Sequence, residues 1–323
     1  MSKRISISSR INTLLRIYVV GYPLRGESII CQIIDSSTSD ILFSMVVDCF
    51  KYYNQNRTLE ILKRNGIDQK KIDMVCWTHP DYDHSYGLDE IISSCCDQNT
   101  LYVVPKNFYG DKHSVIQNNK EDYKIVQHIA NLLPREKNVQ SGYVTIDVAA
   151  GELCQINHFS LVDAEGELPI QIVAYAPISQ QINNRILKSQ KISKNELSIF
   201  MGIKVGEYQF LLCGDTENDA IDTMDESYFR DVIFVKIPHH SSLTSIHLLT
   251  LLKNEILIAC TTTYKIKGLP NQQVIAAYKN KTRHMDSTGA PINGEKYGMI
   301  TYDFDLFNKK EVKITHSGHA ICL

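Results

Sequence analysis

The sequence predicts an α+β fold in which two mixed β-sheets pack together and helices cover their outer faces. Short apolar runs typical of strands follow one another in the first part of the chain, and later runs alternate with helical patterns. That order is typical of two packed sheets with helices outside. The 323 residues, 43% of them hydrophobic, suffice for one large core or two small ones. The spread of motifs favours a single domain over residues 1–323.

Hydrophobic periodicity gives the elements in chain order. The first strands are expected at 17–21, 28–34, 41–48 and 72–77, followed by a helix near 88–94, a strand at 101–104 and a helix near 121–133. Later strands are expected at 143–148, 170–175, 198–204, 208–213, 232–237, 256–260 and 298–304, with helices at 217–224, 243–253 and 271–280 between them. We take about 15–305 as the core, 107–170 as an elaboration or lid, and 306–323 as a C-terminal tail.

Composition favours a soluble, cytoplasmic protein. No apolar run approaches the ~18 residues of a membrane helix, and Arg16 interrupts the N-terminal run from Leu14 to Tyr22. Nine cysteines without C-x-x-C spacing indicate a reducing compartment rather than a disulfide framework. A formal net charge of −2 excludes a broadly basic surface, so nucleic-acid binding would need a local basic stripe.

The strongest chemical signal is the stretch THPDYDHSYGL at 78–88. Its four potential metal ligands fall within six positions directly after a strand-like run; they are His79, Asp81, Asp83 and His84. Imidazoles and carboxylates together hold Zn²⁺ or Mn²⁺, and two such ions ~3.5–4 Å apart can activate a water for displacement at phosphorus or carbon. The pattern therefore predicts a two-metal hydrolase.

This stretch resembles the first motif, H-x-[HD]-x-D-H, of the metallo-β-lactamase superfamily. The variant with Asp at the third position is similar to the hydrolase domain of the bacterial DNA-uptake channel protein ComEC and its free-standing relatives. Other segments resemble further motifs of that family in the same order: GESII at 26–30, MVVDC at 45–49, NELSI at 195–199, FLLCGD at 210–215 and VKIPHHSS at 235–242. The resemblance implies the αββα sandwich of that superfamily and two divalent ions, Zn²⁺ or Mn²⁺, as cofactors.

Ligand chemistry applied to the matched positions suggests a role for each side chain. His79 and Asp81 are expected to hold one ion, Asp83 and His84 the other, and Asp215 to bridge both with its two oxygens. An alternative interpretation makes Asp215 only the cap of the helix at 217–224.

Two adjacent histidines end another predicted strand. We expect His240 to bind metal and His239 to orient it or to donate a proton to a leaving group. The expected catalytic residues are thus Asp83, Asp215, His239 and His240.

Departures from the family pattern fall near the chemistry. Leu269-Pro270 stands where the family commonly has His-Pro, and His284 or His158 could supply the missing imidazole. Loss of an imidazole leaves a carboxylate-rich site and shifts the metal preference toward harder ions such as Mn²⁺.

A basic run without an acid precedes the NELSI segment and predicts the substrate-binding surface. Phosphates are expected to contact Lys188, Lys191 and Lys194, with Asn195 and Ser198 beside them. The resemblance then favours a nuclease or phosphodiesterase that cleaves DNA. Two alternatives stay open: a phosphodiesterase or esterase acting on a small molecule, and a metal-depleted binding or sensor protein.

Overall fold

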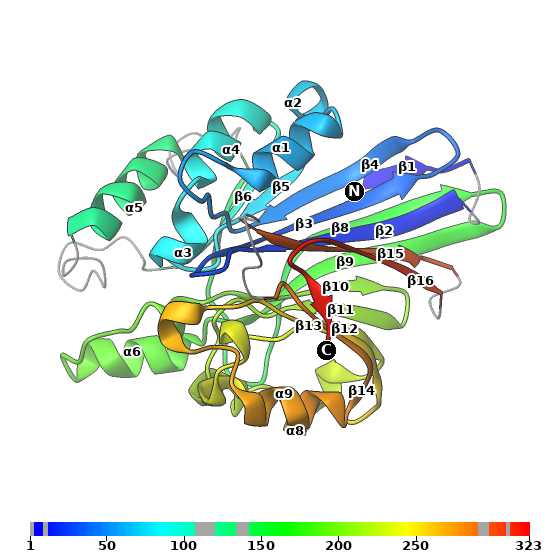
Figure 1. The fold of residues 1–323 in the computed structure, drawn as a ribbon. Helices are drawn as coiled ribbons and strands as arrows, with labels where there is room; N and C mark the ends of the chain where they lie inside the picture. Colours follow the sequence, from blue (N-terminus) through cyan, green and yellow to red (C-terminus); the bar gives the residue numbers. More distant parts are fainter. Residues whose placement is uncertain (1–2, 9–11, 107–119, 134–141, 290–296, 308–310) are drawn as a thin grey trace.

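The protein has four layers in the order helix, sheet, sheet, helix (Figure 1). The computed structural model describes residues 3–8, 12–106, 120–133, 142–289, 297–307 and 311–323. Within them, two mixed β-sheets lie face to face and helices cover both outer sides. The predicted α+β class is confirmed, and the arrangement is that of the metallo-β-lactamase sandwich.

The first sheet has nine strands among the described residues. In spatial order they are β1 (Lys3–Ser6), β8 (Cys154–Asp163), β9 (Gly166–Ala176), β10 (Phe200–Val205), β11 (Tyr208–Leu212), β12 (Val232–Lys236), β13 (Ile256–Thr261), β14 (Thr282–Ser287) and β17 (Ile321–Cys322). Strands β11 to β14 run parallel, whereas β8 to β11 form an antiparallel meander.

The second sheet has eight strands in the described part of the chain. In spatial order they are β16 (Val312–Gly318), β15 (Gly298–Asp305), β2 (Thr13–Gly21), β3 (Glu27–Asp35), β4 (Asp40–Val47), β5 (Met74–Cys76), β6 (Leu101–Pro105) and β7 (Tyr143–Ile146). Strands β4 to β7 are parallel and the others antiparallel.

Helices form the two outer layers. The eight-stranded sheet is covered by α1 (Arg57–Arg64), α2 (Ile67–Lys70), α4 (Leu88–Cys95) and α5 (Lys120–Leu132), and the nine-stranded sheet by α7 (Asn218–Ile221), α8 (Leu248–Leu251) and α9 (Gln272–Lys279). The short α3 (Tyr82–Ser85) and the projecting α6 (Ser179–Leu187) lie at one end of the sandwich. None of the helices described here is both long and apolar enough to cross a membrane.

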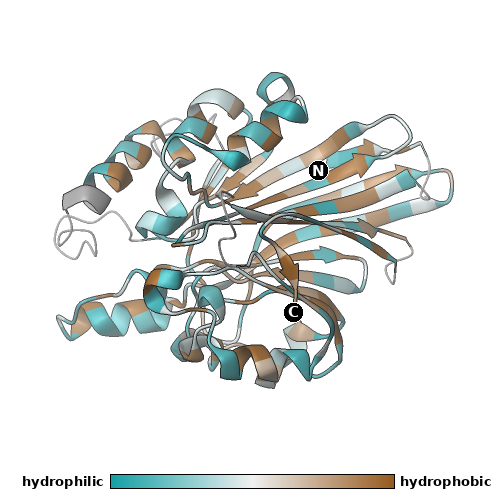
Figure 2. Ribbon diagram, in the orientation of Figure 1, coloured by the Kyte–Doolittle hydropathy of each residue, from teal (hydrophilic) through white to brown (hydrophobic). Residues whose placement is uncertain are grey.

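Three buried clusters hold these layers together. The central cluster lies between the sheets and includes Ile17, Ile172 and Phe234, each fully buried. Neighbouring positions such as Tyr18 and Val235 belong to the clusters beneath the helices. Because both faces of the central strands are covered, apolar residues occupy most of their positions, and these strands are mainly brown in Figure 2.

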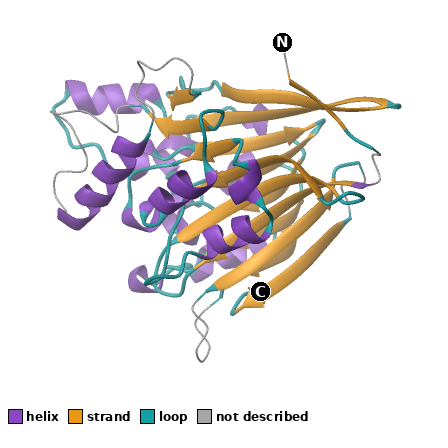
Figure 3. Ribbon diagram, turned by 90° about the horizontal axis from the view of Figure 1, so that it is seen from above, coloured by secondary structure: helices purple, strands orange, loops and turns teal. Residues whose placement is uncertain are grey.

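The parallel strands position the functional residues. Parallel neighbours end at the same edge of a sheet, and loops that follow their carboxyl ends meet there. Asp48 and His79 follow β4 and β5, and Asp215 and His240 follow β11 and β12. In the view from above, most helices and loops gather at one end of the long strands (Figure 3).

Several elements differ from the predicted ones. The segment 107–170 contributes α5, β7 and β8 to the layers, while its residues 107–119 and 134–141 lie outside the described part. The segment 306–323 contributes the sheet strands β16 and β17. The predicted helix 243–253 is a 3₁₀ turn, Leu243–Ser245, followed by α8. Strands β14 and β16 escape a periodicity search because polar residues dominate both, TRHMDS and VKITHSG.

Candidate metal centre

Asp215 lies in the middle of a buried group of histidines and carboxylates. Its Oδ1 is 3.3 Å from His84 Nε2 and 4.0 Å from His240 Nε2, and its Oδ2 is 3.9 Å from His79 Nε2 and from His239 Nε2. Asp215 is only 3% exposed. Its two oxygens therefore face imidazoles from two different sheets.

Asp83 completes one side of this group. Its Oδ2 lies 3.4 Å from His240 Nε2 and 3.9 Å from His84 Nε2. Asp83, His84 and His240 offer ligand atoms that all lie within 4.8 Å of one another, and all three residues are buried. Two imidazoles and a carboxylate at this separation form a donor set suited to Zn²⁺ or Mn²⁺.

Asp48 orients the first two histidines. Its Oδ2 accepts a hydrogen bond from His84 Nδ1 at 2.7 Å and another from the Thr78 hydroxyl at 2.5 Å. Because Thr78 donates to Asp48, its oxygen accepts from His79 Nδ1, at 2.9 Å. Both rings are thereby fixed with Nε2 facing Asp215, which is how outer carboxylates commonly hold metal-binding histidines.

A similar relay holds His240. The Thr262 hydroxyl donates to Glu27 and accepts from His240 Nδ1 at 2.8 Å. Glu27 is also paired with Lys236 at 2.8 Å, and both side chains are almost fully buried. Burial alone would raise the pKa of Glu27, but Lys236 and His240 lower it to about 2, so Glu27 is a carboxylate that can accept from Thr262.

The donor atoms that face the middle of the group have no hydrogen-bond partner among the described residues. They are His79 Nε2, Asp83 Oδ2, His84 Nε2, Asp215 Oδ1 and His240 Nε2. Buried polar atoms without partners are costly and rare in folded proteins, unless they bind water or an ion. All five are atoms of the kind that bind metals, and they surround the same small space. The residues present therefore fit a divalent metal centre.

The charges of the group are strongly coupled. Burial would raise the pKa of Asp215, but His84 and His240 hold it well below its usual value. Burial lowers the pKa of His79, and the neighbouring His84 lowers it further. In His84 the effect of burial is outweighed by Asp215 and Asp48, which raise its pKa. Perturbed groups concentrated in one place are typical of functional sites.

Asp81, an expected ligand, lies at the rim of this group. Its Oδ1 accepts from the backbone N–H of Tyr82, capping α3, and from Lys194 Nζ at 2.9 Å. Lys194, expected to contact substrate, thus forms an ion pair with the site itself. Asp81 and Lys194 border an open hollow whose other lining residues are Lys191, Ser193, Asn195 and Glu217.

His239 lies at the same rim rather than inside the group. Its Nδ1 lies 2.9 Å from the Thr244 hydroxyl and 3.2 Å from Glu217, and its side chain is 21% exposed. Asn195, an expected substrate contact, lies beside Glu217 and His239 Nε2, at 3.3 and 3.5 Å. Burial would lower the pKa of His239, but Glu217 and Asp215 raise it.

Of the other residues expected to contact substrate, one supports the metal centre from inside and two lie exposed on the surface. Ser198 is buried, and its hydroxyl accepts from the backbone N–H of Asp215 at 2.9 Å, so it positions that residue. Gly214 has a φ of +51°, and a Cβ there would lie 2.5 Å from Ser198 Oγ, which explains glycine before Asp215. Lys188 and Lys191 are exposed. The cap residue of α7 is Glu217, so Asp215 does not cap that helix.

Other residues near the group could not be found from the motif. Tyr264 packs edge-on against His240, with ring centroids 5.1 Å apart. Burial, together with Asp83 and Asp81, raises the pKa of Tyr264 to about 12, so its hydroxyl keeps its proton at neutral pH. The sequence did contain a clue to the Glu27–Lys236 pair: Lys236 is a charged residue at the end of an otherwise apolar strand, and a buried charge needs a partner.

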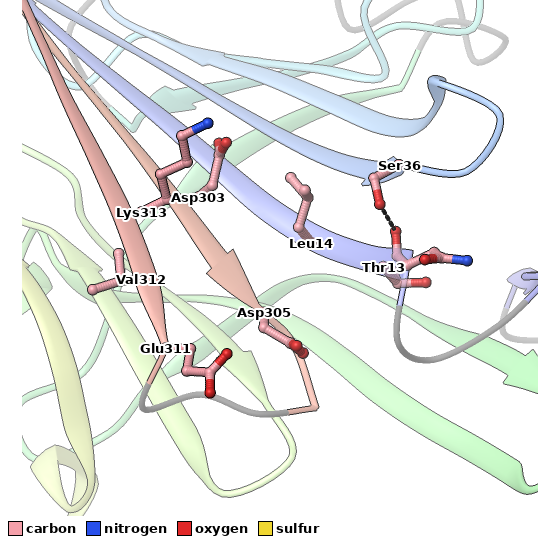
Figure 4. A pocket seen from close by; sticks show the side chains of 9 residues that line it. Thr13, Leu14, Ser36, Asp303, Asp305, Glu311, Val312 and Lys313 are labelled. Carbon is pink, nitrogen blue, oxygen red and sulfur yellow. Dashed lines mark hydrogen bonds between the residues drawn. The ribbon is translucent and has the colours of Figure 1, made fainter.

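The proposed substitutes for the missing histidine lie elsewhere. His284, on β14, contacts Asp286 at 2.9 Å, and His158 is exposed on β8. A larger hollow, lined by Asp303, Asp305, Glu311 and residues of β2 and β16, is also separate from the histidines (Figure 4). None of the residues that form the metal centre lines this hollow.

The fold and the site define a class of protein: a two-sheet sandwich with a buried histidine and carboxylate centre at the ends of its parallel strands. Residues 43–123 match the model of the Metallo-beta-lactamase superfamily, and this match includes His79, Asp81, Asp83 and His84. No curated protein matches the chain. The match and the fold support a metallo-β-lactamase superfamily domain, and that superfamily consists mostly of metal-dependent hydrolases.

The chelator-treated protein, resupplied with Zn²⁺ or Mn²⁺ and passed through a desalting column, is expected to retain at least one divalent ion per chain at this centre. The physical reason is the set of unpartnered donor atoms described above. Elemental analysis measures it, with Asp83→Ala/His84→Ala as the variant that loses ions. Retention below about 0.2 ions per chain would contradict a metal centre, because a folded site of this donor type binds tightly near neutral pH.

Proposed function

We propose that the protein is a metal-dependent phosphodiesterase that cleaves DNA. The observation that carries the proposal is the pairing of a buried donor set with an open hollow whose rim bears Lys191 and Lys194. The resemblance of the histidine and aspartate motifs to the DNA-uptake hydrolase adds the substrate class. The reaction is the attack of water at phosphorus with cleavage of one P–O bond, giving a phosphate monoester and an alcohol.

Divalent ions held by the centre would supply an activated water and stabilise the negative charge that develops at phosphorus. The protein's own residues would do the rest. His239 is anchored through Nδ1 by Glu217 and Thr244, so its Nε2 faces the centre from the rim. From there a protonated His239 would donate to the departing oxygen.

Tyr264 and Arg25 would position the phosphodiester from another side of the centre. The guanidinium of Arg25 lies 4.1 Å from the centre of the Tyr82 ring, and this cation–π contact restrains it. A neutral phenol and a fixed guanidinium are both hydrogen-bond donors suited to a phosphate oxygen. Both residues are only partly buried, so a substrate could reach them.

The basic run beside α6 would guide the DNA backbone. Arg185 is paired with Glu196, and Lys194 with Asp81. Lys188 and Lys191 have no such carboxylate partner among the described residues, which leaves them for phosphates. Two carboxylates on the rim, Asp81 and Glu217, would repel the phosphates of a DNA backbone. They favour the second candidate, a phosphodiesterase that acts on a small molecule with fewer phosphate contacts.

Replacing Lys188 and Lys191 together by glutamate is expected to raise the KM for single-stranded DNA several-fold and to flatten its salt dependence. Fewer counterions are released when fewer phosphates are neutralised. The kcat should change little, because the centre and His239 are untouched. Steady-state kinetics on a labelled oligonucleotide with Mn²⁺ or Zn²⁺, at two salt concentrations, measure both constants.

The matched control is Lys279→Glu/Lys281→Glu, which makes the same charge change at the amino end of β14, the end opposite to the centre. Its KM should stay near that of the wild type. An equal KM effect in both variants would mean that total charge, not the α6 region, steers DNA. Absence of DNA cleavage with several metals, together with hydrolysis of a small phosphodiester, would favour the second candidate.

A further inference from the structure

A second group of metal-ligand side chains lies apart from the centre and shares no residue with it. His284 and Asp286 lie on β14, in the nine-stranded sheet, and His316 lies on β16, at the edge of the eight-stranded sheet. The ligand atoms of these three residues lie within 4.8 Å of one another. In the sheet, Asp286 lies beside Cys260 of β13, and Cys260 lies beside Lys236 of β12. Strand β13 therefore separates Asp286 from β12, the strand that leads to His240.

The three side chains converge on one oxygen atom. His284 Nε2 and His316 Nε2 lie 2.9 and 2.7 Å from Asp286 Oδ1. The other oxygen, Oδ2, accepts from the buried hydroxyl of Tyr302 at 2.8 Å. Tyr302 thereby fixes the carboxylate so that Oδ1 faces both imidazoles, and hydrogen-bonded carboxylates of this kind are typical of metal sites.

The charge of Asp286 needs a counter-charge. The residue is 0% exposed, and among the described residues no lysine or arginine forms an ion pair with it. Buried carboxylates are normally paired with a cation or bind a metal. The imidazoles are the open side of the group, since their side chains are 32% and 29% exposed, and an ion can therefore enter from solvent.

We propose that His284, Asp286 and His316 bind a zinc ion that links the two sheets at their edge. Zinc sites with three protein ligands and one water are common, and tetrahedral bonds of about 2.0 Å place ligand atoms roughly 3.3 Å apart. The two Nε2–Oδ1 distances of 2.9 and 2.7 Å reach that spacing when the exposed rings move away from Oδ1 by about half an ångström. The ion would replace the two Nε2 protons that otherwise point at Oδ1.

The location gives the site a structural role. The chain passes from β16 of one sheet to β17 of the other immediately after His316, as the red C-terminal segment of Figure 1 shows. A zinc ion here would connect β14 with β16 across the sandwich and hold this terminal crossing in place. Because the ion binds the folded chain, it would raise the melting temperature.

Zinc titration of a full-length variant whose first centre is disabled, Asp83→Asn/His84→Gln/Asp215→Asn, isolates the second site. Isothermal calorimetry of this chelator-treated protein with Zn²⁺ alone is expected to show about one ion per chain, and excess Zn²⁺ to raise its melting temperature by a few degrees. Adding His316→Gln, or separately His284→Gln, should abolish both effects. Two single variants are used so that one that fails to fold does not decide the result.

The matched control is His247→Gln in the same background. His247 is an exposed imidazole that also contacts an aspartate, Asp222 at 2.8 Å, but no third ligand lies with this pair among the described groups. This variant should keep the bound ion. Zinc binding that survives both His316→Gln and His284→Gln, or a background protein that binds none, would overturn the proposal.

Discussion

Replacing Asp215 by alanine is expected to abolish hydrolysis, with a rate loss on the order of 10³-fold or more, and to release at least one metal ion. Asp215 is the side chain around which the imidazoles of both sheets are arranged, at 3.3 to 4.0 Å. Its carboxylate packs little apolar surface, so the fold should persist. The rate on the wild-type substrate, elemental analysis and a thermal melt together measure these effects.

Asp222→Ala is the matched control for this experiment. It removes an exposed aspartate seven positions further along the chain, whose partner His247 has no part in the centre. Its rate and metal content should equal those of the wild type. Near-normal activity of Asp215→Ala at comparable stability would show that the centre is wrongly assigned, and Asp215→Asn would then test whether charge matters at all.

Replacing Lys236 by methionine is expected to lower the free energy of unfolding by about 3–5 kcal/mol, the usual cost of leaving one charge of a buried ion pair alone. Lys236 and Glu27 have side-chain exposures of 0% and 2% and lie 2.8 Å apart. Methionine keeps the length of the side chain but leaves the Glu27 carboxylate without its cation. Urea unfolding followed by circular dichroism measures the loss.

Two further variants separate charge from packing. The double variant Glu27→Gln/Lys236→Met removes both charges and should recover a large part of the loss, because neither partner is left ionised in the interior. Lys253→Met breaks an exposed pair with Glu226 and should cost no more than about 1 kcal/mol. A cost for Lys236→Met as small as that for Lys253→Met would mean that Glu27 takes up a proton and the pair contributes little.

The Glu27 and Lys236 pair also bears on the chemistry. Glu27 accepts from Thr262, which accepts from His240, so the orientation of His240 depends on a carboxylate held by a buried lysine. Asp48 does the same for His79 through Thr78. Metal affinity should therefore fall in Lys236→Met even under conditions in which that variant is folded.

The sequence by itself determined the fold class and the place of the candidate ligands along the chain. Both are local properties: the period of apolar residues shows the strands, and polar residues directly after a strand must lie at its carboxyl end. His79, Asp83, His84, Asp215 and His240 follow β5, β11 and β12 and lie together. Parallel strands bring their carboxyl ends to one edge, so local spacing was enough.

Only the tertiary structure decided which partner each charged side chain has. The sequence predicted a substrate contact for Lys194 but did not show its partner Asp81, 113 positions away. It also did not show that Glu27 contacts Thr262 across 235 positions. Polar strands such as β14 and β16 carry no apolar period, so the meeting of Asp286 with His316 was equally invisible. Such contacts depend on the register and stacking of two sheets, because a shift of one residue along a strand turns every side chain to the opposite face.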